Sequence, residues 1–312
     1  MKNIRLIQLI FIGLLTISTV STQNKTKDYI YIKGVKFVSP LLEKWITEYG
    51  KVNPLVQIKI ADKQTSEKEI DLNLFVNEFP ADSLQPDLKI NYVGRYALLP
   101  IASRNNLHFS DYTKKGINKK KLKELFFQKD LLAEDKKSSE TEYPVTIYSG
   151  NTSYSGANSF ATYFGYKPSE IKGKRISGDD IYLISAIKKD SNGVTFNNLS
   201  YIFDINTRQI KTDITLLPLD IKKEQREVLN SENIDQLIAL LEAESIDLIP
   251  VLHIGFIYTD YQNPEVGKFL KWVLADGQKF NHTYGFLNPD KETLAYQKRM
   301  VDGVLLTSMS VK

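Results

Sequence analysis

The chain has 312 residues, of which 42% are hydrophobic and 25% charged, a globular composition long enough for two domains. Its formal charge of +4, from 41 basic and 37 acidic residues, is too balanced to indicate a nucleic-acid partner. The chain has no cysteine, which excludes a disulfide framework and a lipid attached through cysteine, and argues against a tight zinc site.

The first 22 residues have the three parts of a secretory signal peptide. Lys2 and Arg5 precede an apolar run from Leu6 to Ile17, and small residues follow up to Thr22. The run is shorter than the roughly 20 apolar residues that a membrane-spanning helix needs. We therefore expect residues 1–22 to be cleaved and the mature protein to be periplasmic or secreted.

Strand and helix patterns alternate along the rest of the chain. Alternating or β-branched residues predict strands over 29–38, 55–61, 71–76, 92–102, 144–148, 193–203, 214–219 and 246–258. Apolar residues at helical spacing predict helices over 39–50, 119–127, 179–189, 234–243, 263–277 and 288–300. The charged segment 129–142 reads as an exposed loop. This alternation indicates an α/β fold with parallel or mixed sheets.

The stretch SGNTSYSGANSFATYFG, from Ser149 to Gly165, combines hydroxyl side chains and glycines with the start of an apolar helix face. Helix N-termini present unpaired N–H groups and a partial positive charge, so this loop is a candidate anion site. An ordinary serine N-cap fits the same residues. A nucleophilic Ser153 or Ser155 is a third interpretation.

Catalytic motifs give little support to an enzyme. The sequence contains no G-x-S-x-G, no Walker A, no G-x-G-x-x-G and no H-E-x-x-H pattern. Its three histidines, His108, His253 and His282, are far apart along the chain. We therefore expect no catalytic residue, no metal and no cofactor.

Three stretches in the same order resemble PstS-type periplasmic phosphate-binding proteins. The first, GVKFVSPLLEKWITEYGKVNPLVQIKI, matches through Gly34, Phe37, Trp45, Tyr49, Asn53-Pro54 and Val56. The second is similar to the family's phosphate loop, D-G-S-G-T-x-x-T-F, through Ser155, Gly156 and Phe160. The third, EVGKFLKWVLADGQKFNHTYGFLN, matches through Phe269, Leu270, Trp272, Gly277-Gln278 and Gly285-Phe286.

The resemblance implies a type II periplasmic binding-protein fold, with two α/β lobes joined by two crossing strands and a ligand cleft between them. Residues 23–98 and 250–312 would form lobe 1, and residues 99–249 would form lobe 2. The strand over 92–102 would be the first crossing, and the return would lie within 217–258. Ligand binding would close the lobes about a hinge.

The resemblance also implies a function: capture of inorganic phosphate or a related oxyanion for an ABC importer, through its permease, by a monomer without a nucleic-acid partner. The cleft would be lined by Lys36, Phe37, Asn77, Ser149, Asn151, Thr152, Ser153, Ser155, Gly156 and Ala157.

Several of these positions depart from the family pattern. Lys36 stands where a threonine is usual, Ala157 replaces a threonine, and Asn151 and Ser153 replace an arginine and an aspartate. Each lost hydrogen bond to a charged ligand costs about 1.5–3 kcal/mol, so a few could abolish tight phosphate binding. The alternative is therefore a degenerate binding protein that acts as an envelope sensor or a protein-interaction module.

Overall fold

The computed structural model describes residues 29–76, 88–106, 116–128, 145–259 and 263–310. The expected signal peptide, Asn77, His108 and the charged segment 129–142 lie outside the described residues. Among the described helices, none is long and apolar enough to cross a membrane.

A curled, mixed sheet runs through the molecule in the order β2-β1-β3-β9-β4-β7-β5-β6, with β8 paired to β4. Parallel pairs join β1 to β2 and β3, and β5 to β6 and β7, whereas β4 and β9 pair antiparallel with their neighbours. The strands are β1 Tyr29–Lys33, β2 Gln57–Ile60, β3 Ile70–Phe75, β4 Lys89–Ser103, β5 Thr146–Gly150, β6 Lys174–Ile176, β7 Gly193–Asn198, β8 Ile214–Leu216 and β9 Val251–Tyr258.

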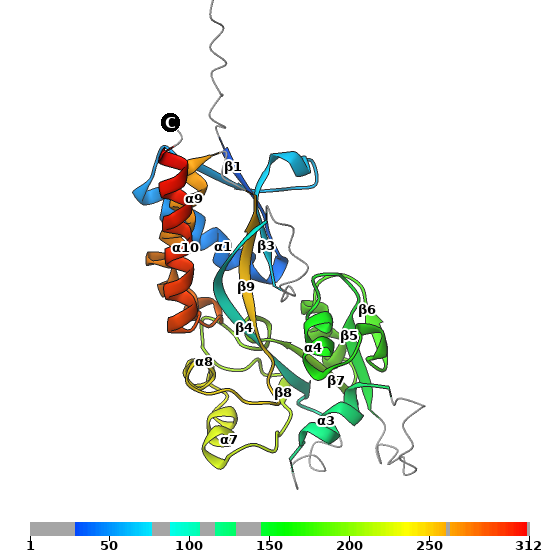
Figure 1. Ribbon diagram of the computed structural model, residues 1–312. Helices are drawn as coiled ribbons and strands as arrows, with labels where there is room; N and C mark the ends of the chain where they lie inside the picture. Colours follow the sequence, from blue (N-terminus) through cyan, green and yellow to red (C-terminus); the bar gives the residue numbers. More distant parts are fainter. Residues whose placement is uncertain (1–28, 77–87, 107–115, 129–144, 260–262, 311–312) are drawn as a thin grey trace, which may run out of the picture.

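The long strand β4 divides the sheet into two parts (Figure 1). Its first part, up to Ala97, pairs with β9, and its second part, from Leu98, pairs with β7 and β8. We call the β1, β2, β3, β9 side lobe 1 and the β5, β6, β7, β8 side lobe 2. The expected two-lobed α/β architecture is confirmed, while the exact lobe bounds stay a prediction.

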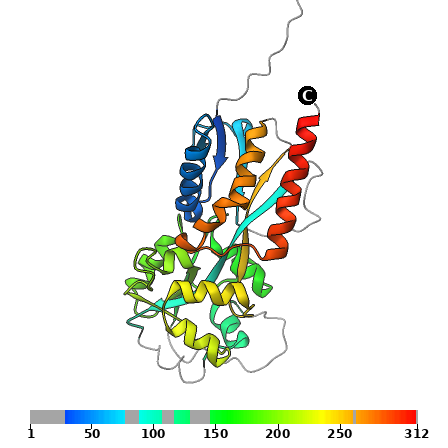
Figure 2. The ribbon, with the colours of Figure 1, turned by 90° about the vertical axis from the view of Figure 1, so that its left-hand side faces the viewer.

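Helices flank both lobes (Figure 2). In lobe 1, α9 packs against α10, and α1 contacts β2. The α-helices are α1 Ser39–Val52, α3 Lys119–Phe126, α4 Gly156–Phe164, α5 Ile181–Lys188, α6 Leu199–Ile202, α7 Lys223–Asn230, α8 Ile234–Ala243, α9 Pro264–Leu274 and α10 Lys291–Ser310. The short 3-10 helices are η1 Lys36–Val38, η2 Glu67–Glu69, η4 Pro168–Glu170, η5 Asp276–Phe280 and η6 His282–Tyr284.

Several predicted strands are too long, among them 29–38 and 214–219, which end at Lys33 and Leu216. The strand expected over 193–203 ends at Asn198, because the Asn198 side chain accepts the Tyr201 N–H and begins α6. The strand expected over 246–258 begins only at Val251, after a turn closed by the hydrogen bond from Ile249 N to Ile246 O.

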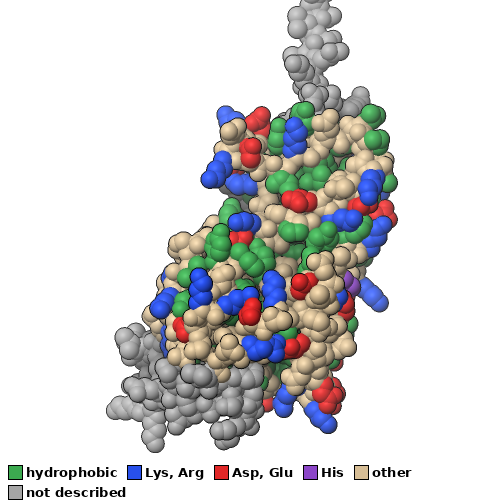
Figure 3. Space-filling model, turned by 180° about the vertical axis from the view of Figure 1, so that it is seen from behind, with side chains coloured by type: hydrophobic (Ala, Val, Ile, Leu, Met, Phe, Trp, Pro, Cys, Tyr) green, Lys and Arg blue, Asp and Glu red, His purple; other side chains and the backbone are tan. Residues whose placement is uncertain are grey.

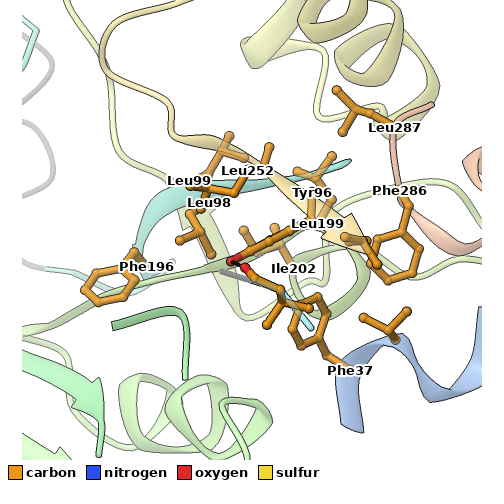
Figure 4. Packing of buried hydrophobic residues seen from close by; sticks show 14 of the residues in the cluster. Phe37, Tyr96, Leu98, Leu99, Phe196, Leu199, Ile202, Leu252, Phe286 and Leu287 are labelled. Atoms are coloured by element: carbon orange, nitrogen blue, oxygen red, sulfur yellow. Dashed lines mark hydrogen bonds between the residues drawn. The ribbon is translucent and has the colours of Figure 1, made fainter. Parts of the chain in front are cut away.

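The hydrophobic core is continuous across both lobes. Phe37 from lobe 1 packs against Phe286, with ring centroids 6.0 Å apart, and both lie near Leu199 of lobe 2 (Figure 4). On the face seen in Figure 3, hydrophobic side chains gather across the middle, with basic and acidic side chains interspersed around them. Because Phe37, Phe286 and Leu199 bury apolar surface between the lobes, this packing stabilises the conformation in which the lobes touch.

Candidate functional site

The Ser/Gly loop (residues 149–157) connects β5 to α4 in lobe 2. Ser155 is buried and caps α4: its Oγ accepts the Ala157 N–H at 3.1 Å. Gly156 and Ala157 form the first turn and are also buried. The N-terminus of α4 therefore presents the backbone donors that the sequence predicted for an anion site.

A carboxylate of the protein itself occupies that N-terminus. Asp180, in the segment before α5, accepts the Gly156 N–H at 2.7 Å with Oδ2 and the Ser155 hydroxyl at 2.8 Å with Oδ1. A negative charge at a helix N-terminus is favourable, so the Asp180 carboxylate satisfies donors that the sequence predicted for an oxyanion. The Ser155 hydroxyl and the Gly156 N–H, which were expected to bind a ligand, thus donate to a side chain of lobe 2 instead.

Gly150 is required by this arrangement. A Cβ at position 150 would lie 2.2 Å from Ser155 Oγ and 2.3 Å from Asp180 Oδ1. Both distances are far inside van der Waals contact, so any side chain here would push the serine and the carboxylate apart. The glycine therefore permits the strand end, the cap and Asp180 to pack together.

A second carboxylate, Asp179, lies at the boundary between the lobes. Its side chain is only 6% exposed, and its Oδ2 accepts the Tyr201 hydroxyl at 2.9 Å and lies 3.5 Å from Lys36 Nζ of lobe 1. Its Oδ1 accepts the N–H of Ile181, the first residue of α5. Lys36 therefore compensates a carboxylate of lobe 2, although its own side chain is 74% exposed.

Phe37 and Tyr96 connect the lobes beside this ion pair. The Phe37 ring, 8% exposed, lies 5.2 Å from that of Tyr96 and 6.4 Å from that of Tyr201. The Tyr96 hydroxyl donates to Val76 O at the end of β3 and lies 3.0 Å from Ser159 Oγ in α4. One tyrosine thus ties the end of a lobe 1 strand to the helix that follows the Ser/Gly loop.

The remaining residues predicted for the cleft have other contacts or are exposed. Ser149 is fully buried, and its Oγ accepts the Arg175 guanidinium at 2.6 Å. Asn151 is exposed and donates to Ser177 Oγ, while Thr152 and Ser153 accept the Asn158 amide through their carbonyls. The structure thus brings Lys36 and Phe37 near Tyr201, and Ser155, Gly156 and Ala157 around Asp180, with Ser149 behind them.

The charges around Asp179 and Asp180 disfavour the binding of an anionic ligand. Burial raises the pKa of Asp180, while the hydrogen bonds from Gly156 and Ser155 act in the opposite direction. Burial and the hydrogen bond to Asp179 raise the pKa of Tyr201, which keeps its hydroxyl a donor. Two carboxylates, Asp179 and Asp180, thus lie beside one lysine, Lys36, so an oxyanion that enters here meets acidic groups.

Sequence reasoning did not identify the two aspartates as site residues. They lie in Ser177-Gly178-Asp179-Asp180, a polar run between β6 and α5, which had the ordinary signature of a helix start. Among the described residues, no group of three or more histidine, aspartate or glutamate side chains could hold a metal ion.

Comparison with solved structures shows matches over most of the chain. An ABC-type phosphate transport receptor from Vibrio cholerae superposes with a TM-score of 0.56 at 10% identity, covering 84% of this chain and 100% of the other. A Clostridium perfringens protein, provisionally assigned as a phosphate ABC transporter substrate-binding protein and solved with bound phosphate, gives 0.54 at 16% identity, with coverage of 84% and 100%.

Other ligand-binding domains match almost as well. The effector binding domain of a BenM variant gives a TM-score of 0.50 at 12% identity, covering 85% of this chain and 100% of the other. No family model matches the sequence, and no curated protein sequence matches it. The three-dimensional similarity, at this low identity, shows that the chain has the type II periplasmic binding-protein fold of PstS-type phosphate-binding proteins.

Proposed function

We propose that the protein is an exported, non-catalytic member of this fold whose anion position is filled by Asp180, and which acts as an envelope sensor or protein-interaction module. The observation that carries the proposal is the pair of hydrogen bonds from Gly156 N and Ser155 Oγ to the Asp180 carboxylate. The predicted signal peptide supports export.

The Asp180 contact belongs to lobe 2 alone. Asp180, Ser155 and Gly156 all lie on the same side of the lobe boundary, so a hinge motion that separates the lobes leaves their hydrogen bonds intact. Opening the cleft therefore does not free the α4 N-terminus for phosphate. An entering oxyanion would have to displace a buried carboxylate that forms two short hydrogen bonds.

Isothermal titration of the mature protein with phosphate and sulfate tests this proposal. We expect the wild type to give no heat of binding, and Asp180→Ala to bind phosphate because two donors and the space of a carboxylate become available. Asp180→Asn keeps the space of the carboxylate filled and should give no heat of binding. Asp220→Asn, which removes an exposed carboxylate of the same lobe, is the matched control.

Circular dichroism of each variant shows whether it is folded before it is titrated. Tight phosphate binding by the wild type would overturn the proposal. If a folded Asp180→Ala variant gave no heat of binding with phosphate, Asp180 would not be what blocks an anion site.

The second candidate is capture of phosphate or a related oxyanion for an ABC importer. It is supported by the resemblance in three ordered stretches and by the capped α4 N-terminus, which keeps the geometry of an anion site. In this case the wild type itself binds phosphate, sulfate or molybdate in the same titration. Permease and ATPase genes next to this one would also favour this candidate.

A further inference from the structure

A cavity of about 230 Å³ lies between the lobes, separate from the α4 N-terminus. Phe37, Pro40, Tyr284 and Phe286 line it from lobe 1 and the segment before α10. From lobe 2 it is lined by Ser200, Tyr201, Phe203, Asp204, Ile205, Asn206 and Lys211. Five aromatic side chains thus contribute to its walls, which is typical of sites for small organic molecules.

The aromatic walls are held in place by the surrounding core. Phe286 and Phe203 are each 1% exposed, and Phe37 lies 6.0 Å from Phe286 between ring centroids (Figure 4). Tyr201 is fixed at its other end by the hydrogen bond from its hydroxyl to Asp179. A flat apolar group could therefore bind against this aromatic wall without ordering mobile side chains first.

Lys211 brings a positive charge to the cavity. Its ammonium group donates to Tyr201 O at 2.8 Å, and among the described residues no carboxylate lies within ion-pair distance of it. Burial lowers the pKa of Lys211 and the neighbouring Lys188 acts in the same direction, while the charge of Asp204 acts in the opposite direction without outweighing them. A ligand carboxylate that accepted the remaining N–H groups would relieve the cost of this half-buried charge.

The other charged groups near Lys211 are already engaged. Asp204 lines the cavity, but its Oδ1 accepts the backbone N–H groups of Asn206 and Thr207, which fixes the local turn. Lys188 pairs with Asp213 at 2.6 Å. Asp204 and Lys211 are therefore the two charged groups that line the cavity. The carboxylate is held by backbone N–H groups, whereas Lys211 has N–H groups left for a ligand, so an anion is favoured over a cation.

We propose that this cavity binds a small carboxylate with a flat apolar body, with the aromatic rings holding the body and Lys211 holding the carboxylate. The site goes beyond the proposed function, since it uses neither the Ser/Gly loop nor Asp180. Because its walls come from both lobes, the ligand would favour the conformation in which the lobes touch.

Three probes that share one ring and differ in charge test the proposal: benzoate, benzamide and benzylammonium. We expect titration of the mature wild type to show benzoate as the tightest of the three. Lys211→Met keeps most of the apolar side chain and removes the charge, so benzoate binding should weaken about tenfold or more while benzamide binding is unchanged. Lys189→Met, which removes an exposed lysine that does not line the cavity, is the matched control and should bind benzoate as the wild type does.

Thermal denaturation shows that each variant is folded before titration. Equal affinity of the wild type for benzoate and benzamide, or a preference for benzylammonium, would overturn the assignment of Lys211. Absence of binding by all three probes would overturn the site itself. Neither outcome depends on whether phosphate binds at α4, so the two proposals fail separately.

Discussion

At the scale of single residues, Gly150 tests how tightly the Ser/Gly loop packs against Asp180. We expect Gly150→Ala to lower the free energy of unfolding by about 1–3 kcal/mol, because the added Cβ would lie 2.2 Å from Ser155 Oγ and 2.3 Å from Asp180 Oδ1. Gly50→Ala in α1 is the matched control: no atom lies within 4 Å of its added Cβ. There the same substitution should stabilise the helix by about 0.5–1 kcal/mol.

Urea denaturation of the two variants beside the wild type measures both effects. An unchanged midpoint for Gly150→Ala would show that the loop and Asp180 can separate at little cost. That result would contradict the close packing of Gly150 against Ser155 and Asp180, on which the proposed role of Asp180 at the α4 N-terminus depends.

At the scale of elements, the sequence predicts those whose signals are local. Asn118 and Asn263 begin α3 and α9 as expected, because each side chain accepts a backbone N–H two or three residues later. The end of the strand within 193–203 was harder to predict. All six residues of β7 are buried, so no alternation of apolar and polar residues marks where the strand ends before α6. The contact between Asp180 and Gly156 joins two elements 24 residues apart, and no local pattern reveals such a pairing.

The cap of α4 gives a prediction at this scale. We expect Ser155→Ala to lower the free energy of unfolding by about 1–2 kcal/mol, because it removes both the cap of Ala157 N and a hydrogen bond to Asp180. Ser153→Ala, two residues earlier and exposed, should change it by less than about 0.5 kcal/mol. Equal denaturation midpoints for the two variants would contradict the capping role.

At the scale of the whole molecule, the segment 281–288 joins lobe 1 to lobe 2 through contacts other than the Lys36–Asp179 ion pair. Its Leu287 pairs with Arg95 of β4, while its carbonyls at His282 and Thr283 accept the guanidinium of Arg208 in lobe 2. The segment also meets α8 of lobe 2 through Glu242. The two lobes are thus joined by polar contacts as well as by the continuous core.

Glu242 makes this second connection sensitive to acid. Its Oε1 lies 2.8 Å from His282 Nε2 and accepts the Asn288 N–H at 2.6 Å. Burial raises the pKa of Glu242, but these two hydrogen bonds, together with the electrostatic effects of His282 and Arg95, outweigh burial and hold the pKa below its ordinary value. Because the unfolded chain then takes up the proton first, the stabilisation is complete above the ordinary glutamate pKa of about 4.3 and is lost as the pH falls through the lower, folded value.

We therefore expect Glu242→Gln to lower the free energy of unfolding at pH 7 by about 1 kcal/mol, since a hydrogen bond to a neutral amide is weaker than one to a carboxylate. The variant should also lose less stability than the wild type between about pH 5 and pH 3, because one carboxylate with a lowered pKa is gone. Glu227→Gln, whose side chain is 67% exposed on α7, is the control and should follow the wild type at every pH. Urea denaturation at intervals across this range measures the difference. Parallel pH profiles for Glu242→Gln and the wild type would mean that the connection between 281–288 and α8 does not depend on this charge.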